Sequence, residues 1–304
     1  MKKICVLIPC LNEALTVGHV IKNFKKQIPS CKVFVYDNGS SDDTIAVAKK
    51  NGAEVVLVED KGKGNVVRRM FSHQHHGDYF IMIDGDGTYD ISRIKDMLKL
   101  IENNQLDMVV GSRKHLDSKA YRRGHIIGNF FFSKMVSIIF GNKIQDLFSG
   151  FRIFSRRFIK TFPLHSSGFE IEAELTIHAL EQKLPVGEID CKYNVRLQGS
   201  NSKLKTFSDG IKILKLILVL VKDEKPLFFF LLLAIIFLIL SLLLGIPIIF
   251  QFYETKLVDK LPSAVLSGFL MVLAFLSFFS GLILDVVKKI RYENKRLKYL
   301  SFKE

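Results

Sequence analysis

The sequence predicts an α/β domain with a mainly parallel sheet, followed by two membrane-spanning helices. In the first 112 residues, short apolar runs alternate with amphipathic stretches, which is the pattern of strand–helix units. After residue 226, two long apolar runs are separated by a short polar link. Hydrophobic residues make up 48% of the 304-residue chain, which fits a protein that is partly embedded in lipid. Its net charge of +14 is compatible with nucleic acid, anionic lipid or phosphorylated substrates as partners.

The strands and helices of the first domain are expected in strict alternation. The predicted strands are Ile4–Ile8, Lys32–Tyr36, Glu54–Val58, Tyr79–Ile83 and Met108–Val110. The predicted helices are Ala14–Gln27, Asp43–Lys50, Gly64–Gln74 and Ile91–Asn103. Because helices that connect parallel strands cover both faces of the sheet, we expect a three-layer domain.

Polar side chains follow four of these strands. They are Asn12 and Glu13, then Asp37 to Gly39, then Asp84 to Asp86, and finally Gly111 to Arg113. In open parallel sheets, ligands bind beyond the carboxyl ends of the strands. Ordinary turns and helix caps use the same residue types. Four such turns at one edge, two of them rich in acid, favour a nucleotide site.

The triplet Asp84-Gly85-Asp86 is the sharpest local signal in the chain. Two carboxylates on a turn after a buried strand can hold a divalent cation such as Mg²⁺, which typically takes one or two carboxylates together with phosphate oxygens. A cation at this position would bridge the two phosphates of a sugar nucleotide and stabilise charge on the leaving group.

The C-terminal part contains apolar runs at residues 227–252 and 261–284. Each exceeds the roughly 20 residues needed to cross the hydrocarbon core, and the link Tyr253–Lys260 is short enough to require a hairpin. The segment after the second run is rich in Lys and Arg, and positive residues stay on the cytoplasmic side. The N-terminus lacks the apolar stretch of a signal peptide, so we expect both the N-terminal domain and the C-terminus in the cytosol.

Between the domain and the hairpin lies Phe207–Lys222, whose lysines fall on one helical face. This pattern favours a helix in the membrane interface, with a core helix of the first domain as the alternative. The predicted boundaries are residues 1–206 for the catalytic domain, 207–225 for the juxtamembrane helix and 226–287 for two spans (about 227–252 and 261–287). A basic cytosolic tail is expected at residues 288–304.

Several motifs taken together resemble a family-2 inverting glycosyltransferase of the Rossmann-like GT-A fold. They are Pro9 to Glu13, Tyr36 to Thr44, Gly62 to Asn65 and Asp84 to Gly87. Later segments resemble the branch of dolichyl-phosphate mannosyltransferases and bacterial polyprenyl-phosphate glycosyltransferases. These segments are Asp146 to Arg152, Phe169 to Glu172, Arg196 and Gly199 to Leu204. One departure is Asn38, where the family often has a second acid, and this change is expected to be tolerated.

The resemblance implies a role for each matching residue. Those expected to bind the sugar nucleotide are Pro9, Asn12, Glu13, Asp37, Lys63, Asp84, Gly85 and Asp86. Asp84 and Asp86 would also bind Mg²⁺ or Mn²⁺, and Asp86 and Asp146 are the expected catalytic carboxylates. Those expected to bind the acceptor or its phosphate are Arg113, Arg152, Arg196, Ser200 and Lys203. Because an acceptor phosphate is already nucleophilic, Asp146 is expected to orient the acceptor or the metal ion rather than to take a proton.

The resemblance therefore implies transfer of a hexose-type sugar from a UDP- or GDP-sugar to a polyprenyl phosphate, undecaprenyl or dolichyl. The product would serve cell-envelope glycan synthesis, and the protein would be a multi-pass protein of the cell membrane. A homo-oligomer is compatible with this branch. The alternatives are a synthase with a saccharide acceptor and a non-catalytic nucleotide-binding scaffold. Nucleic-acid binding is not expected, since much of the positive charge flanks the membrane spans.

Overall fold

The computed structural model describes residues 2–73, 76–115, 132–137, 140–141, 145–163, 168, 170–194, 219 and 221–302. The chain divides into two compact units. The sheet unit comprises Met1–Lys212 and Lys295–Glu304, and the hairpin unit comprises Ile213–Asn294.

A seven-stranded sheet forms the centre of the sheet unit, with strand order β3-β2-β1-β4-β6-β5-β7. The strands are β1 (Ile4–Cys10), β2 (Lys32–Asp37), β3 (Glu54–Leu57), β4 (Tyr79–Met82), β5 (Met108–His115), β6 (Arg152–Ser155) and β7 (Val186–Tyr193). All neighbours are parallel except β6, which runs antiparallel to both β4 and β5. The mainly parallel sheet predicted from the sequence is confirmed.

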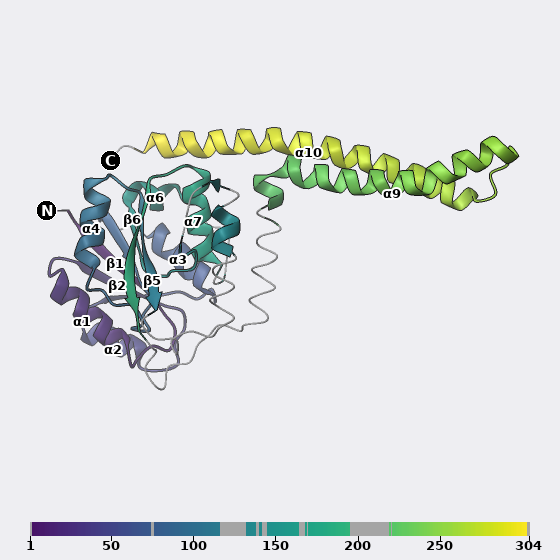
Figure 1. The fold of residues 1–304 in the computed structure, drawn as a ribbon. Helices are drawn as coiled ribbons and strands as arrows, with labels where there is room; N and C mark the ends of the chain where they lie inside the picture. Colours follow the sequence, from purple (N-terminus) through teal and green to yellow (C-terminus); the bar gives the residue numbers. More distant parts are fainter. Residues whose placement is uncertain are drawn as a thin grey trace. The chain divides into compact units, whose positions relative to one another are not determined.

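Helices cover both faces of this sheet, as Figure 1 shows. On one face, α1 (Val17–Gln27), α2 (Thr44–Lys50) and α4 (Ile94–Asn103) bury apolar residues such as Phe24, Ala48 and Met97. On the other face, α3 (Lys63–Ser72), α6 (Arg156–Thr161) and α7 (Ile171–Glu181) contribute a second apolar cluster. The two clusters fix the sheet between two layers, so the loops beyond its strand ends are presented from a rigid frame.

Two strands are absent from the sequence prediction, and one prediction at β5 is wrong. β6 and β7 lie after residue 112, beyond the part of the chain for which strands and helices were predicted. β6 is only four residues long. Gly111, Ser112 and Arg113 were expected in a turn after β5, but they lie within it and pair with Ile189 to Cys191 of β7. The strand is long because β7 provides a parallel partner along its whole length.

The hairpin unit contains α9 (Pro226–Thr255) and most of α10 (Leu261–Ser301). Both helices are long and apolar enough to cross a membrane, with mean hydropathies of 3.3 and 2.4 over their most apolar windows. Ser241 donates to the carbonyl of Ser267 at 2.8 Å, and Ser267 donates back to the carbonyl of Ser241 at 3.0 Å. These reciprocal bonds join the two helices as an antiparallel pair.

The last residues of α10 belong to the sheet unit. Lys295 forms an ion pair with Glu181 at 2.7 Å, and Tyr299 is 5% exposed with its hydroxyl donating to Asp107. The basic segment expected as a tail from residue 288 is therefore helical up to Ser301. Most of the juxtamembrane helix predicted at residues 207–225 lies outside the described residues, which resume at Val219 and Val221.

Candidate active site

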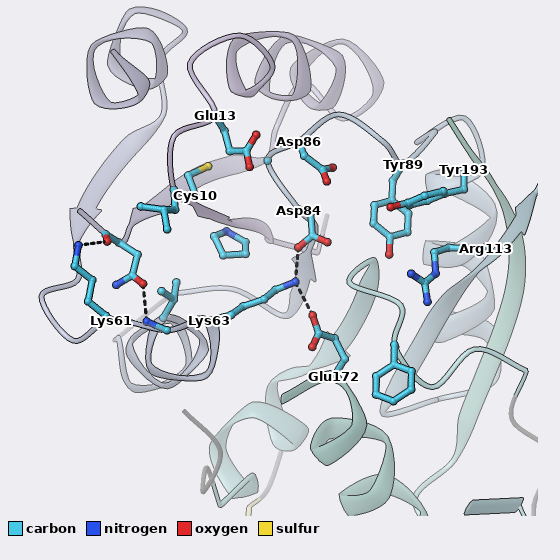
Figure 2. Close-up of a pocket in the computed structure, with 17 residues that line it drawn as sticks. Cys10, Glu13, Lys61, Lys63, Asp84, Asp86, Tyr89, Arg113, Glu172 and Tyr193 are labelled. Carbon is cyan, nitrogen blue, oxygen red and sulfur yellow. Dashed lines mark hydrogen bonds and ion pairs between the residues drawn. The ribbon is translucent and has the colours of Figure 1, made fainter. Parts of the chain in front are cut away.

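A cavity of about 250 Å³ lies beyond the carboxyl ends of β1, β2 and β4. Figure 2 shows charged side chains that point into it from different elements. Sequence-predicted residues in its wall are Pro9, Glu13, Lys63, Asp84, Gly85, Asp86 and Arg113. Other residues of the wall include Asn38, Lys61, Tyr89, Phe148, Glu172 and Tyr193.

Lys63 bridges two carboxylates at the centre of this cavity. Its Nζ lies 2.6 Å from Asp84 Oδ1 and 2.5 Å from Glu172 Oε1, and these contacts are drawn in Figure 2. Burial alone would lower the pKa of Lys63, but the charges of Asp84 and Glu172 outweigh it and hold that pKa above its usual range. Lys63 is therefore a buried cation, positioned from the first turn of α3 beside the acidic triplet.

Asp84 and Asp86 lie on the turn that follows β4. Gly150 lets Asp84 approach closely, because a Cβ at position 150 would lie only 2.5 Å from Asp84 Oδ2. Asp86 is 4% exposed, and its Oδ1 accepts hydrogen bonds from the main chain and the hydroxyl of Thr88 at 3.1 and 2.6 Å. Two hard oxygen donors on one turn, facing a cavity, fit a divalent cation that takes its remaining ligands from phosphate and water. No group of three or more metal-ligating side chains occurs among the residues that the structure describes.

Arg113 is held on the opposite side of the cavity by Asp146. Its Nε and Nη2 donate to the two carboxylate oxygens at 2.7 Å each, and its main-chain N–H donates at 3.1 Å. Burial would raise the pKa of Asp146, but the hydrogen bond and charge of Arg113 outweigh it, so the pKa lies below its usual value. Asp146 is 3% exposed and lies behind Arg113, so the arginine and not the carboxylate is presented to the cavity.

Two tyrosines form the wall next to Arg113. Tyr89 and Tyr193 make an edge-to-face pair at 5.1 Å, and the guanidinium of Arg113 lies 5.6 Å from the ring centre of Tyr193. The Tyr89 hydroxyl accepts a hydrogen bond from the main chain of Gly150 at 2.8 Å. This contact ties the turn after β4 to the loop before β6, so the acidic triplet and the Asp146 loop are held together.

With this geometry in view, comparison with known proteins assigns the family. Residues 5–162, just over half of the chain, match the model of glycosyl transferase family 2. The chain belongs to this family. It is therefore a glycosyltransferase.

Relatives of this glycosyltransferase share the same domain. It is 32% identical over 228 residues to the glycosyltransferase AglJ of Haloferax volcanii, covering 75% of each chain. It is 27% identical to the dolichyl-phosphate β-glucosyltransferase of Dictyostelium discoideum, covering 69% of this chain and 71% of that one. The glucosyl-3-phosphoglycerate synthase of Mycobacterium tuberculosis, solved with Mn²⁺, UDP and glucosyl-3-phosphoglycerate, has the same fold. Its TM-score is 0.56 at 21% identity, covering 73% of this chain and 79% of that one.

Two residues expected at the nucleotide, Asn12 and Asp37, do not line the cavity of the glycosyltransferase. Asp37 is fully buried and accepts hydrogen bonds from the main chain of Gly39 and Ser40 at 3.0 and 2.9 Å. Asn12 has a positive φ of 53°, and its side-chain oxygen accepts from the main chain of Ser41 at 2.8 Å. Both residues shape the loops around Pro9 and Glu13, which do line the cavity.

Asn38 holds the loop before α3 in place. Its side-chain amide donates to the carbonyls of Val58 and Asp60 at 3.0 and 2.7 Å, and its oxygen accepts from Gly62 N–H at 2.8 Å. An aspartate could not donate to either carbonyl. The departure from the family pattern at this position therefore has a specific use in this chain, which the sequence alone does not reveal.

The expected phosphate contact by Arg152 is wrong. Arg152 is 0% exposed in β6, and its guanidinium donates to the carbonyls of Ser149 and Leu147 and to the hydroxyl of Thr176, each within 2.8 Å. A fully buried charged side chain needs such partners. Arg152 therefore supports the loop that contains Asp146 from below.

The structure does not test the remaining predicted residues. Arg196, Ser200 and Lys203 fall outside the residues that the structure describes. Conversely, Glu172, Tyr89 and Tyr193 line the cavity although no role was expected for them from the sequence. Glu172 occurs in a segment that resembles the family, so a signal existed. The tyrosines carried none, because their proximity depends on β7.

Proposed function

We propose that this glycosyltransferase moves a hexose-type sugar from a UDP- or GDP-sugar to a polyprenyl phosphate at the cytosolic face of a membrane. The observation that carries the proposal is the placement of charge in one cavity. Acidic residues on the turn after β4 face a buried lysine on one side, and an arginine fixed by Asp146 stands on the other. A donor diphosphate and an acceptor phosphate would each need a cationic side chain, and Lys63 and Arg113 would provide one each.

The donor would bind between β1 and the acidic triplet. Pro9 and Glu13 would contact the nucleoside, and Lys63 would face the diphosphate. Asp84 and Asp86 would hold a divalent cation, which would neutralise the charge that develops on the leaving diphosphate. The Mn²⁺ and UDP bound by the synthase of the same fold support this arrangement. Donor binding would also separate Lys63 from Asp84, leaving Glu172 to retain the ammonium group near the phosphates.

The acceptor phosphate would bind at Arg113. A guanidinium suits a phosphate because its planar donors match two oxygens at once. Asp146 fixes the guanidinium through a two-point contact, so little conformational entropy is lost when the acceptor arrives. The names of two relatives, the dolichyl-phosphate β-glucosyltransferase and a dolichyl-phosphate hexose transferase, support a lipid phosphate.

The reaction would be a single displacement. An oxygen of the acceptor phosphate forms a bond to the anomeric carbon while the bond from that carbon to the donor diphosphate breaks. The electron pair leaves with the nucleoside diphosphate, and the configuration at the carbon inverts. No proton is transferred, so a general base is not required, and catalysis would rest on positioning and charge stabilisation.

The hairpin unit supports a membrane location for the acceptor. Its two helices expose apolar side chains along most of their length, which water would not favour. The expected orientation, with the sheet unit and C-terminus in the cytosol, would give the site access to soluble sugar nucleotides and to lipid headgroups.

The proposal is tested with membranes that contain the full chain. They are incubated with a panel of radiolabelled UDP- and GDP-sugars and undecaprenyl phosphate, with Mg²⁺ or Mn²⁺ and with a chelator. Label should enter the lipid phase from at least one donor, only when a divalent cation is present, and not with Asp86→Asn. Failure of every donor to label the lipid would refute the proposal.

A further inference from the structure

A second cavity of about 390 Å³ lies at the opposite edge of the sheet from the candidate active site. Lys2 precedes β1 and Asp78 precedes β4, so these residues mark the amino ends of the two strands. Cys10 and Asp84, which line the candidate active site, stand at the other ends of these strands. We call this second cavity the basic pocket, and it is lined by Lys2, Asp78, Arg156, Arg157, Lys160 and Phe302, among others.

Positive charge dominates the basic pocket. Among the residues that the structure describes, Lys2, Arg156 and Lys160 have no carboxylate partner within ion-pair distance. The one carboxylate of its wall, Asp78, accepts a hydrogen bond from the main chain of Lys3 at 2.7 Å. Cations gathered around a cavity repel one another, and a bound anion would offset that repulsion.

Arg157 is held in a fixed position in the wall. Its Nη2 lies 3.3 Å from Asp107 Oδ1, and its guanidinium lies 4.3 Å from the ring centre of Tyr299. Asp107 is 0% exposed and is anchored by the Ser155 hydroxyl at 2.7 Å. Arg157 Nη1 makes no hydrogen bond to any described residue, so it is a preorganised donor beside the other cations of the pocket.

We propose that the basic pocket binds a phosphate-bearing group, separate from the substrates of the active site. Arginine and lysine side chains at close range are the usual protein partners of phosphate oxygens. The cavity is larger than a phosphate ion, so it has room for an attached small group such as glycerol. The exposed ring of Phe302 at its edge offers an apolar contact beside the charge. Such a group comes either from a soluble phosphate ester or from the headgroup of an anionic phospholipid.

The test uses the full chain in nanodiscs of neutral phosphatidylcholine, titrated calorimetrically with glycerol 3-phosphate. The double variant Arg156→Ala/Lys160→Ala is compared with the wild type. The control is Lys95→Ala/Lys99→Ala, which removes the same charge from the exposed face of α4. Phosphate binding in the active site is common to all three proteins, so the difference between them reports the basic pocket. Equal thermal midpoints confirm that each variant is folded.

We expect the double variant to bind glycerol 3-phosphate about tenfold more weakly or worse, since two charge-assisted contacts are lost, while the control binds like the wild type. Equal binding by the double variant and the wild type would overturn the proposal, as would an equal loss in the control. A second arm repeats the titration in nanodiscs that contain phosphatidylglycerol. If the headgroup is the natural occupant, wild-type binding of the soluble ester is suppressed there; if a soluble ester is the occupant, binding is unchanged.

Discussion

At the scale of single residues, Asp146 and Arg113 are joined by three hydrogen bonds at the candidate active site. The carboxylate is buried and accepts three hydrogen bonds from one arginine, so it is poorly placed to take a proton. Its described contacts fit a residue that positions Arg113. The sequence-based expectation that Asp146 orients rather than accepts a proton remains a prediction, and this geometry gives it a specific partner.

Asp146→Asn should lower kcat by about a hundredfold, because the asparagine amide leaves Arg113 without its charged anchor. The dissociation constant of the sugar nucleotide should stay within about twofold of the wild-type value, since the donor contacts other residues. Steady-state kinetics and calorimetry check the two values. Asp96→Asn is the matched control, because Asp96 also pairs with an arginine but on the exposed surface. Near-normal turnover of Asp146→Asn would contradict the assignment.

Asn38→Asp should destabilise the sheet unit by about 2–4 kcal/mol, because the carbonyls of Val58 and Asp60 would lose their donors and face a carboxylate. Chemical unfolding measures the change, with Asn104→Asp on the exposed surface as control. This outcome is opposite to the one suggested by family resemblance, which often places an acid here. Wild-type stability in Asn38→Asp would show that the amide contacts are dispensable.

His178 should make stability depend on pH. It is 5% exposed between Phe158 and Phe162, and neither ring nitrogen has a partner among the described residues. Burial, with a smaller effect of Lys295, lowers its pKa to about 3. In the unfolded chain, His178 therefore takes up a proton as pH falls through about 6.5, whereas in the folded chain it stays neutral until pH approaches 3. The free energy of unfolding therefore has its full value, as far as His178 is concerned, above pH 6.5, and it decreases as pH falls from 6.5 toward 3.

The His178→Phe variant should lose this part of the pH dependence, which amounts to at most about 1.4 kcal/mol per pH unit. Unfolding free energies at several values between pH 5 and 7.5 give the slopes. His19→Gln, on the exposed face of α1, should keep the wild-type slope. If the slopes of His178→Phe and the wild type coincide, His178 is not the group responsible.

Sequence reasoning reached the acidic side of the site because Asp84 and Asp86 follow a buried strand directly. It did not reach Glu172, whose place beside Lys63 depends on how α7 packs against α3. It misjudged Arg152, because an arginine next to aromatic residues in the sequence is compatible both with a phosphate-binding side chain and with a buried structural one. Only the folded structure distinguishes the two, because it shows that the guanidinium donates to Ser149, Leu147 and Thr176.

At the scale of elements, the alternation of strands and helices predicted every element up to β4 and α4 within a few residues. Periodicity works there because β1, β2 and β4 are mostly buried on both faces and each helix is buried on one face. It did not predict β6, which is four residues long and joins β4 to β5 against the general direction of the sheet. Such an insertion is decided by tertiary pairing and leaves no periodic signal.

The hairpin offers a prediction at the same scale. A Cβ at Gly281 would lie 2.9 Å from Phe230 Cβ and 3.5 Å from the main chain of Leu227, whereas a Cβ at Gly268 meets nothing within 4 Å. Gly281→Leu should therefore force α9 and α10 apart and cost about 1–3 kcal/mol. Thermal unfolding of the full chain in detergent should show a lower midpoint for Gly281→Leu than for Gly268→Leu. Equal midpoints would contradict close packing of the helices at this position.

At the scale of the whole molecule, a family-2 glycosyltransferase domain and an apolar helical hairpin occur in one chain. The proposed donor is soluble and charged, and the two apolar helices are suited to a lipid environment. The basic pocket is a second place on the sheet unit where we propose that a phosphate-bearing group binds. The proposed function requires that the transferred sugar becomes bonded to a lipid phosphate.

The most direct measurement is mass spectrometry of the lipid after reaction of the purified full chain with undecaprenyl phosphate and the active sugar nucleotide. The account predicts that the lipid phosphate gains one sugar residue and that one nucleoside diphosphate is released for each lipid modified. Release of nucleoside diphosphate with an unmodified lipid, or appearance of the sugar on a saccharide instead, would contradict it.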